Sequence, residues 1–219
     1  MSSTNVQNLI EVSTSKDLLI EIISSIFVSM TNRLIAFLQQ YRFFSADEQQ
    51  LIKDSFEPRS YKEGGQLFKG GNICRELFFV CNGVLRIMVT NQKGAELTHF
   101  FLKEDMFCTI LHSFNNEVPA TESIQAACDA DVLAISKSKL LALYKQVPGL
   151  KELLDQIMQN RLLDKIQIRN AYLGADSETR YKLFMQQQPD IVLRVPLKDI
   201  ASYLGITPQS LSRIRKSIK

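Results

Sequence analysis

The hydrophobic periodicity of this chain changes at about Ser138, and that change limits the folds it can adopt. Before this point, from Arg59 onward, glycines punctuate short apolar runs at the intervals expected of strands. After it, apolar residues recur at helical spacing, and one helix-like stretch continues from Pro148 to Gly174. A run of strands followed by long helices predicts the α+β class, with an antiparallel β-domain ahead of the helices.

Turn residues divide the strand region into short segments. Asn82-Gly83 lies between apolar runs at 77–81 and 84–90, and Asn-Gly favours a two-residue hairpin because both residues accept positive φ. A second turn at 91–94 leads into a strand at 96–102, and further strands are expected at 122–127 and 132–135. These segments predict a compact antiparallel β-roll that ends at about Ser136.

The long helix carries an apolar stripe. Five of its apolar residues stand four positions apart, and Leu153 and Ile157 accompany them. A stripe of this length needs a partner surface, and a second copy of the chain would supply one. We therefore predict a two-fold homodimer whose interface contains Leu150, Leu154, Ile157, Met158, Leu162 and Ile166. The alternative is that the stripe packs back onto the β-roll of the same chain.

Local signals place the other helices. Residues 17–38 have an amphipathic pattern, and Ser45 with Glu48 three positions later resembles a capping box that opens a helix to about Ser55. Residues 139–146 are helical in pattern, and Asp176 can cap a helix at 178–187. The expected domains are a partly helical extension (1–30), an effector-like β-roll (31–146), a dimerisation helix (147–174) and a helix-turn-helix domain (175–219).

The helix-turn-helix prediction rests on residues 197–216, which have the pattern of two short helices joined by a tight turn. Gly205 supplies the left-handed position that ends the first helix. Thr207 is a favourable N-cap, and Pro208 stands at the first helical position, where proline is tolerated. Leu211 and Ile214 face inward in the second helix, whose outer face is left polar and basic.

That outer face suits the major groove of DNA. Arginine can bind guanine and glutamine can bind adenine through two hydrogen bonds each, and lysine and arginine also meet phosphates. The region from Ile191 to Lys219 has six basic residues and one acid, hence +5, whereas the whole chain is +3 and the remainder is therefore −2. The candidate DNA-binding residues are Thr207, Gln209, Ser210, Ser212, Arg213, Arg215 and Lys216. The alternative is a helical hairpin with a solvated basic face.

Other classes of function have little support in the sequence. The four cysteines are scattered without a C-x-x-C pair, so we expect no metal site. No motif of a catalytic triad, a phosphate-binding loop or paired carboxylates occurs, so we expect no enzyme. The longest apolar run, 18–30, is short for a membrane span and contains Glu21, so no membrane contact and a cytoplasmic location are expected.

The order of β-roll, long helix and helix-turn-helix resembles the cyclic-AMP receptor/fumarate–nitrate regulator (CRP/FNR) family of bacterial transcription factors. The resemblance is carried by Tyr61-Lys-Glu-Gly-Gly-Gln-Leu-Phe-Lys-Gly-Gly71, by Leu77-Phe-Phe-Val-Cys-Asn-Gly-Val-Leu-Arg-Ile87 and by the terminal motif, which is similar to that of orphan members common in Bacteroidetes-type bacteria. It implies a homodimer on a palindromic DNA operator with half-sites about one helical turn apart. It also implies base reading by Gln209, Ser210 and Arg213, and RNA polymerase as a further partner.

One departure from the family concerns its effector. Cyclic-nucleotide members hold the phosphate with a Gly-Glu pair and an Arg, whose positions correspond here to Cys108, Thr109 and Ala120. No Lys or Arg occurs between Glu104 and Lys137, and a buried phosphate needs a charge-assisted partner. We therefore predict no cofactor and no cAMP binding by the usual mode. A pocket lined by Cys108, Thr109, His112 and Thr121 either takes an unidentified effector or is filled by side chains.

These observations favour a homodimeric, sequence-specific DNA-binding transcription regulator with a degenerate sensor domain. The alternative is a ligand-binding module with the same β-roll that acts on a protein partner without binding DNA, its C-terminal helices being used for protein contacts.

Overall fold

The computed structural model describes residues 21, 24–92 and 94–218, and it confirms the α+β class. The predicted extension 1–30 lies mostly outside the described residues, and of the helix predicted at 17–38 the structure shows residues 24–38. The strands are β1 (Glu57–Tyr61), β2 (Gln66–Phe68), β3 (Glu76–Asn82), β4 (Leu85–Thr90), β5 (Glu96–Leu102), β6 (Phe107–Cys108), β7 (Ser123–Ala126) and β8 (Ala130–Ser136).

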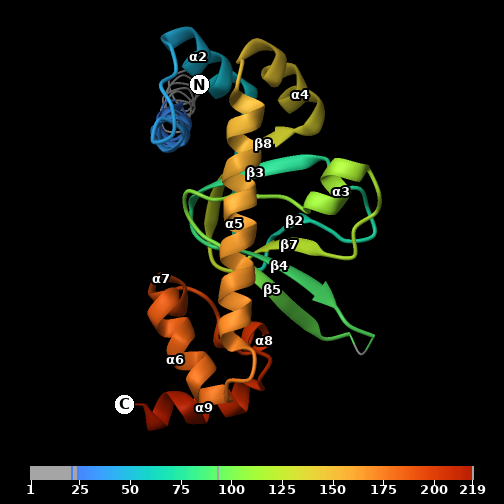
Figure 1. The fold of residues 1–219 in the computed structure, drawn as a ribbon, viewed down its shortest axis with the longest axis vertical. Helices are drawn as coiled ribbons and strands as arrows, with labels where there is room; N and C mark the ends of the chain where they lie inside the picture. The colour runs from blue at the N-terminus through green and yellow to red at the C-terminus, as the bar shows by residue number, and fades with distance from the viewer. Residues whose placement is uncertain (1–20, 22–23, 93, 219) are drawn as a thin grey trace, which may run out of the picture.

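The helices lie around this strand region (Figure 1). The capping box is confirmed, since Ser45 accepts from the backbone of Glu48 and the Glu48 carboxylate accepts in return. Asp176 is likewise the N-cap of its helix. The helices after residue 38 are α2 (Ala46–Ser55), α3 (Leu111–Asn116), α4 (Lys137–Gln146), α5 (Leu150–Tyr172), α6 (Ser177–Gln187), α7 (Pro189–Val192), α8 (Leu197–Leu204) and α9 (Pro208–Ser217).

The β-roll consists of two four-stranded antiparallel sheets. The first sheet has the order β1-β8-β3-β6 and the second has the order β2-β7-β4-β5. Alternate residues of each strand face the space between the sheets, as the period of two requires. That space is filled by buried apolar side chains, among them Phe78, Leu85 and Ile124.

The hairpin predicted at Asn82-Gly83 is wrong. Strand β3 belongs to the first sheet and β4 to the second, and Asn82 pairs with Asp131 of β8. A two-residue hairpin of this type needs positive φ at both residues, but only Gly83 has it, at 87°. A Cβ on Gly83 would lie 2.2 Å from the carbonyl oxygen of Asp129. The glycine therefore lets the chain cross between sheets where the backbones pass closely.

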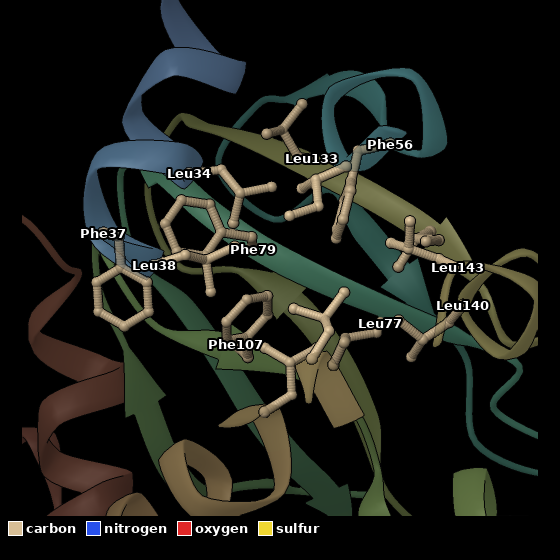
Figure 2. Packing of buried hydrophobic residues seen from close by; sticks show 14 of the residues in the cluster. Leu34, Phe37, Leu38, Phe56, Leu77, Phe79, Phe107, Leu133, Leu140 and Leu143 are labelled. Carbon is tan, nitrogen blue, oxygen red and sulfur yellow. The ribbon is translucent and has the colours of Figure 1, made fainter. Parts of the chain in front are cut away.

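The outer face of the first sheet is covered by the N-terminal helix, α2, α4 and the first half of α5. Side chains from β3, β6 and β8 pack there against these helices in one apolar core (Figure 2). Phe79 lies at its centre, with its ring centroid 5.5 Å from that of Phe37 and 5.1 Å from that of Phe107. Aromatic pairs of this kind contribute about 0.5–1.5 kcal/mol beyond the effect of the area they bury.

The predicted dimer stripe on α5 needs correction for its first half. Leu150, Leu154 and Ile157 are only 1–3% exposed within one chain, because they belong to the core just described. Met158 packs against that core, whereas Leu162 and Ile166 are 44% and 47% exposed. A helix has 3.6 residues per turn, so residues four apart advance about 40° beyond a full turn at each step. The stripe therefore winds around α5, and only its second half faces outward.

The outer face of the second sheet is covered by the C-terminal helices. Val84 and Phe101 of the roll share a buried core with Tyr181, Phe184 and residues of α8. The helix α5 connects the two ends of the molecule, from α4 at one end to the group α6–α9 at the other (Figure 1). The same chain thus places its C-terminal helices directly against its own β-roll.

Candidate functional site

The predicted helix-turn-helix is present, with the boundaries expected from its turn residues. Gly205 has φ of 68° and ends α8, and Thr207 accepts from the backbone N–H of Ser210 at 3.1 Å to cap α9. Leu211 is fully buried, and Ile214 packs against the same core. From the neighbouring helix α6, Arg180 donates to the carbonyl oxygen of Leu204 in α8 at 2.6 Å. The packing fixes which face of α9 is left outside.

That face of α9 is polar and basic. Thr207 lies at its start, Ser210 is half-buried, and the other predicted contact residues are exposed: Gln209, Ser212, Arg213, Arg215 and Lys216. None of the three cations has an ion-pair partner among the residues that the structure describes, and α9 itself contains no acid. Their charges are therefore available to a polyanion, and Leu211 holds them on the surface from the opposite side of the helix.

A buried arginine joins α8 to the β-roll. Arg86 of β4 is 2% exposed, and it donates to Asp199 of α8 at 2.7 Å through Nη1. It also donates to Gln125 through Nε at 2.8 Å and through Nη2 at 2.5 Å, and to Thr98 through Nη1 at 3.2 Å. The remaining N–H group of Nη2 forms the ion pair with Glu96. Five N–H groups of one guanidinium are thus matched with acceptors, which is the condition for burying a charge without a large penalty.

Three further contacts surround this ion pair. Arg194, just before α8, forms a bidentate pair with Glu104 at 2.5 and 2.9 Å. Lys103 pairs with Asp190 of α7 at 2.5 Å. The hydroxyl of Ser202 in α8 accepts from the backbone N–H of Thr98 in β5 at 2.8 Å, which links the helix to the edge strand of the second sheet. The orientation of α8 on the roll is therefore fixed by polar contacts at several points, in addition to apolar packing.

Comparison with known proteins identifies this arrangement. Residues 58–147 match the family model described as the cyclic nucleotide-binding domain. Among solved structures, the c-di-GMP-responsive regulator CLP of Xanthomonas campestris is 18% identical with a TM-score of 0.64, covering 80% of this chain and 91% of that one. The chain has the fold of the CRP/FNR transcription regulators. None of the curated proteins compared matches the sequence.

Two other structures of the same kind agree. A transcriptional regulator assigned to the CRP/FNR family from Eubacterium rectale is 20% identical, with a TM-score of 0.61, and the match covers 80% of this chain and 83% of that one. FixK2 from Bradyrhizobium japonicum is 15% identical, with a TM-score of 0.63, and the match covers 74% and 84%. At these identities the likeness concerns the fold, and the roles of individual residues must come from this chain.

The residues expected at the phosphate-binding positions of the cyclic-AMP receptors can be located in the roll. Ala120, which the resemblance sets against their arginine, is 6% exposed and belongs to the apolar interior. Arg86 is the one buried cation among the described residues, and it points out of the opposite face of the second sheet toward Asp199. A cyclic phosphate placed between the sheets would meet apolar side chains instead of a charged donor.

The four residues predicted to line an effector pocket do not share one open surface. Cys108 is 1% exposed, and burial raises the pKa of its thiol to about 12, so it is a neutral, inert thiol. Thr109 is 7% exposed and donates to the carbonyl oxygen of Glu76 at 2.8 Å. His112 and Thr121 are exposed on the surface. Two of the four predicted residues are therefore buried and two are exposed, and they do not line one pocket.

Sequence reasoning missed the contact between Arg86 and Asp199. A signal was present: Arg86 is a lone charge within an apolar strand, and Asp199 is the lone acid in a basic C-terminal region. Neither observation identifies a partner, because the two residues are far apart in sequence and meet only once the roll and α8 are packed. Among the described residues no group of three or more His, Cys, Asp or Glu is placed to hold a metal, and no helix is long and apolar enough to cross a membrane.

Proposed function

We propose that this protein is a homodimeric, sequence-specific DNA-binding transcription regulator whose β-roll controls the position of its helix-turn-helix. The observation that carries the proposal is the exposed face of α9. It presents one arginine near its middle and a basic pair near its end, with Gln209 beside its start and no acid to neutralise them. Arg213 is suited to two hydrogen bonds with guanine, and Arg215 and Lys216 are suited to phosphates.

The proposed dimer uses the second half of α5. The spacing of a coiled-coil seam, three then four, is found at Leu163, Ile166 and Asn170 of α5, and Leu173, the C-cap of the helix, follows three residues later. Leu163 is 57% exposed, Ile166 is 47% and Leu173 is 72%, so no residue that the structure describes covers this apolar edge. An asparagine inside such a seam favours one register and a defined oligomer. A two-fold pair of these helices would present two copies of α9 to a palindromic operator.

Replacement of Arg213 tests the DNA-binding proposal. An operator is first selected from a random duplex library, and affinities are then measured by gel shift at fixed salt concentration. Arg213→Ala should cost roughly 1–3 kcal/mol on the operator and should relax the preference at one base pair. Lys216→Ala should weaken binding to all sequences alike and reduce the slope of log affinity against log salt by about 1.

Lys145→Ala is the matched control. Lys145 is an exposed cation of the same charge, but it lies on α4, at the opposite end of the molecule from α9 (Figure 1). It should leave operator binding unchanged. If no duplex is selected above background, or if Arg213→Ala keeps full selectivity, α9 is not a base-reading helix and a protein partner becomes the better interpretation of the C-terminal helices.

The dimer proposal has its own test in sedimentation. Ile166→Glu places a charge in the exposed seam and leaves the core of the chain unchanged. The variant should be a folded monomer that no longer binds the palindromic operator. Leu141→Glu, at an exposed leucine of α4, is the control and should remain dimeric. A dimeric Ile166→Glu would place the interface elsewhere. Leu154 is unsuitable for this purpose, since it is buried in the core of its own chain.

A further inference from the structure

A cavity of about 480 Å³ lies where α5 passes between the β-roll and the C-terminal helices. Phe101 and Met106 of the roll form one wall, Ile168 of α5 a second, and Gln188 and Ile191 at α7 a third. The volume is within the range of small-molecule sites in proteins, and the mixture of apolar walls with a few polar groups is typical of them. The cavity is separate from the region between the sheets where the sequence predicted an effector pocket.

The face of α5 that lines the cavity changes character along the helix. Its first half turns Leu150, Leu154 and Ile157 toward the core of the chain. Continuing along the same face at steps of three or four, the next residues are Arg161 and Lys165. Both cations line the cavity, and both also line a smaller space of about 40 Å³ that reaches Thr109 in the roll. Two cations therefore occupy the positions of α5 at which apolar side chains would have continued the core.

Lys165 lacks an anionic partner. It has no ion pair with any residue in the part of the chain that the structure describes, and its ammonium lies 4.7 Å from the centre of the Phe100 ring. Burial lowers the pKa of Lys165, which shows the cost of holding the charge there. The nearby Cys108 is a buried thiol whose pKa is raised by burial, so it is no carboxylate-like partner for the ammonium. Arg161 has only a 3.5 Å contact with Asp164.

We propose that this cavity binds a small organic anion with an apolar body, and that Arg161 and Lys165 pair with its carboxylate or phosphate. The charged residues that line the cavity are three cations, Lys103, Arg161 and Lys165, and one anion, Asp164, so the lining has a net charge of +2. Lys103 is already paired with Asp190, so the two cations of α5 are the available ones. Phe101, Met106 and Ile168 contact the apolar body, and the Gln188 amide contacts its polar atoms.

Such a ligand would touch both sides of the contact between the roll and the C-terminal helices. Phe101 belongs to the core shared with α8, and Lys103 is paired with Asp190 of α7. Both residues line the cavity and also take part in the contact between the roll and the C-terminal helices. A ligand that binds one orientation of the two parts more tightly than another shifts the population toward it. This coupling to DNA rests on the proposed function, whereas binding of the anion does not.

Titration calorimetry of the full chain, without DNA, tests the site with four probes. 2-Naphthoate and 2-naphthyl phosphate share one apolar body and differ in the anionic group, so their ranking distinguishes a carboxylate ligand from a phosphate ligand. 2-Naphthol has the body without the charge, and inorganic phosphate has the charge without the body. At least one naphthyl anion should bind once per chain, at least tenfold more tightly than naphthol and inorganic phosphate.

Variants locate the binding. Lys165→Met and the more conservative Lys165→Gln should each reduce the affinity for the naphthyl anion at least tenfold, while circular dichroism shows an unchanged fold. Lys182→Met removes an exposed lysine of α6 that is paired with Glu178 and should bind as the wild type does. The proposal is overturned if naphthol binds equally well, if both Lys165 variants bind normally, or if neither naphthyl anion binds at millimolar concentration.

A gel shift with and without the bound naphthyl anion then tests the coupling. A change in operator affinity that disappears in Lys165→Met supports control of DNA binding by this cavity. If calorimetry shows anion binding but no DNA binding is found under any condition, the proposed function is wrong and the proposed site stands. If the operator is bound normally but no anion binds, only the proposed anion site is wrong.

Discussion

The two sheets of the β-roll are covered on their outer faces by different kinds of surface. On the first sheet, the contact with the N-terminal helix, α2, α4 and α5 is made by apolar side chains such as Leu34, Phe79 and Leu143 (Figure 2). On the second sheet, the contact with α6–α9 also contains a buried ion pair, a bidentate surface pair and a hydrogen-bonded serine. Exposed ion pairs border the first contact as well, between Arg33 and Asp105 and between Lys139 and Glu57. The buried ion pair is therefore what distinguishes the second contact from the first.

The difference lies in what each contact requires. Apolar packing is non-directional, so it stabilises the helices on the first sheet without depending on one exact geometry. A buried ion pair adds little net stability, but it is favourable only in one geometry, because each charge needs its partner. Arg86 and Asp199 accordingly fix the orientation of α8, and with it the direction in which α9 faces. A regulator that must change this orientation would use the second kind of contact.

Replacement of Arg86 should have the largest effect. Arg86→Met leaves the carboxylate of Asp199, 5% exposed, without its partner and should cost roughly 3–5 kcal/mol. Burial raises the pKa of Asp199, against the opposing effect of Arg86. Without the arginine this pKa rises further, so the folded variant takes up a proton more readily than the unfolded chain. Its deficit should therefore be greatest at neutral pH and shrink as the pH is lowered, which urea unfolding at several pH values measures.

The double variant Arg86→Met/Asp199→Leu is the control for this prediction. It removes both charges and should regain most of the lost stability, because no unpaired charge remains buried. Its operator affinity need not recover, since nothing then fixes the orientation of α8. Equal losses in the single and double variants would mean that Arg86 contributes by filling space, and the contrast between the two contacts would lose its basis.

A truncation in the first contact should have the next largest effect. Leu154→Ala removes a side chain that is 2% exposed in the apolar core and should cost about 3 kcal/mol, within the range of 2–5 for such changes. The loss should be independent of pH, because no titratable group is left unpaired. Leu162→Ala, on the exposed side of the same helix, should cost no more than about 0.5 kcal/mol. Thermal unfolding of both variants, followed by circular dichroism, compares them directly.

Local sequence signals were enough for most of the fold. The helix-turn-helix was located because Gly205, Thr207 and Pro208 act on the backbone next to them, without help from distant residues. The Asn82-Gly83 hairpin failed because the choice between pairing β4 with β3 or with β5 depends on the whole roll. The stripe on α5 failed in its first half because a constant spacing of four does not stay on one face of a helix.

The candidate site divides in the same way. The exposed side chains of α9 follow from its periodicity, since Leu211 and Ile214 determine which face is buried. The pair of Arg86 with Asp199 and the cavity beside Lys165 could not be predicted, because each joins segments that only tertiary packing brings together. The signs left in the sequence were single charges in apolar surroundings, at Arg86 and at Lys165.

The smallest expected effect belongs to the surface pair at the edge of the second contact. Arg194 is 33% exposed and Glu104 is 19% exposed, so Arg194→Ala should cost about 0.5–1 kcal/mol at low salt and less at high salt. Although burial acts to raise the pKa of Glu104, hydrogen bonds from Arg194 and Gly83 leave it below its ordinary value. A carboxyl group whose pKa is lowered in the folded state stabilises the fold at pH values above its pKa in the unfolded chain. This stabilisation is lost as the pH falls through the pKa of the folded state. The difference between wild type and variant should therefore disappear in acid, in the same direction as the deficit predicted for Arg86→Met but starting from a smaller value. Urea unfolding near pH 3 and at pH 7 would show it, and a difference that persisted in acid would assign the effect of Arg194 to packing.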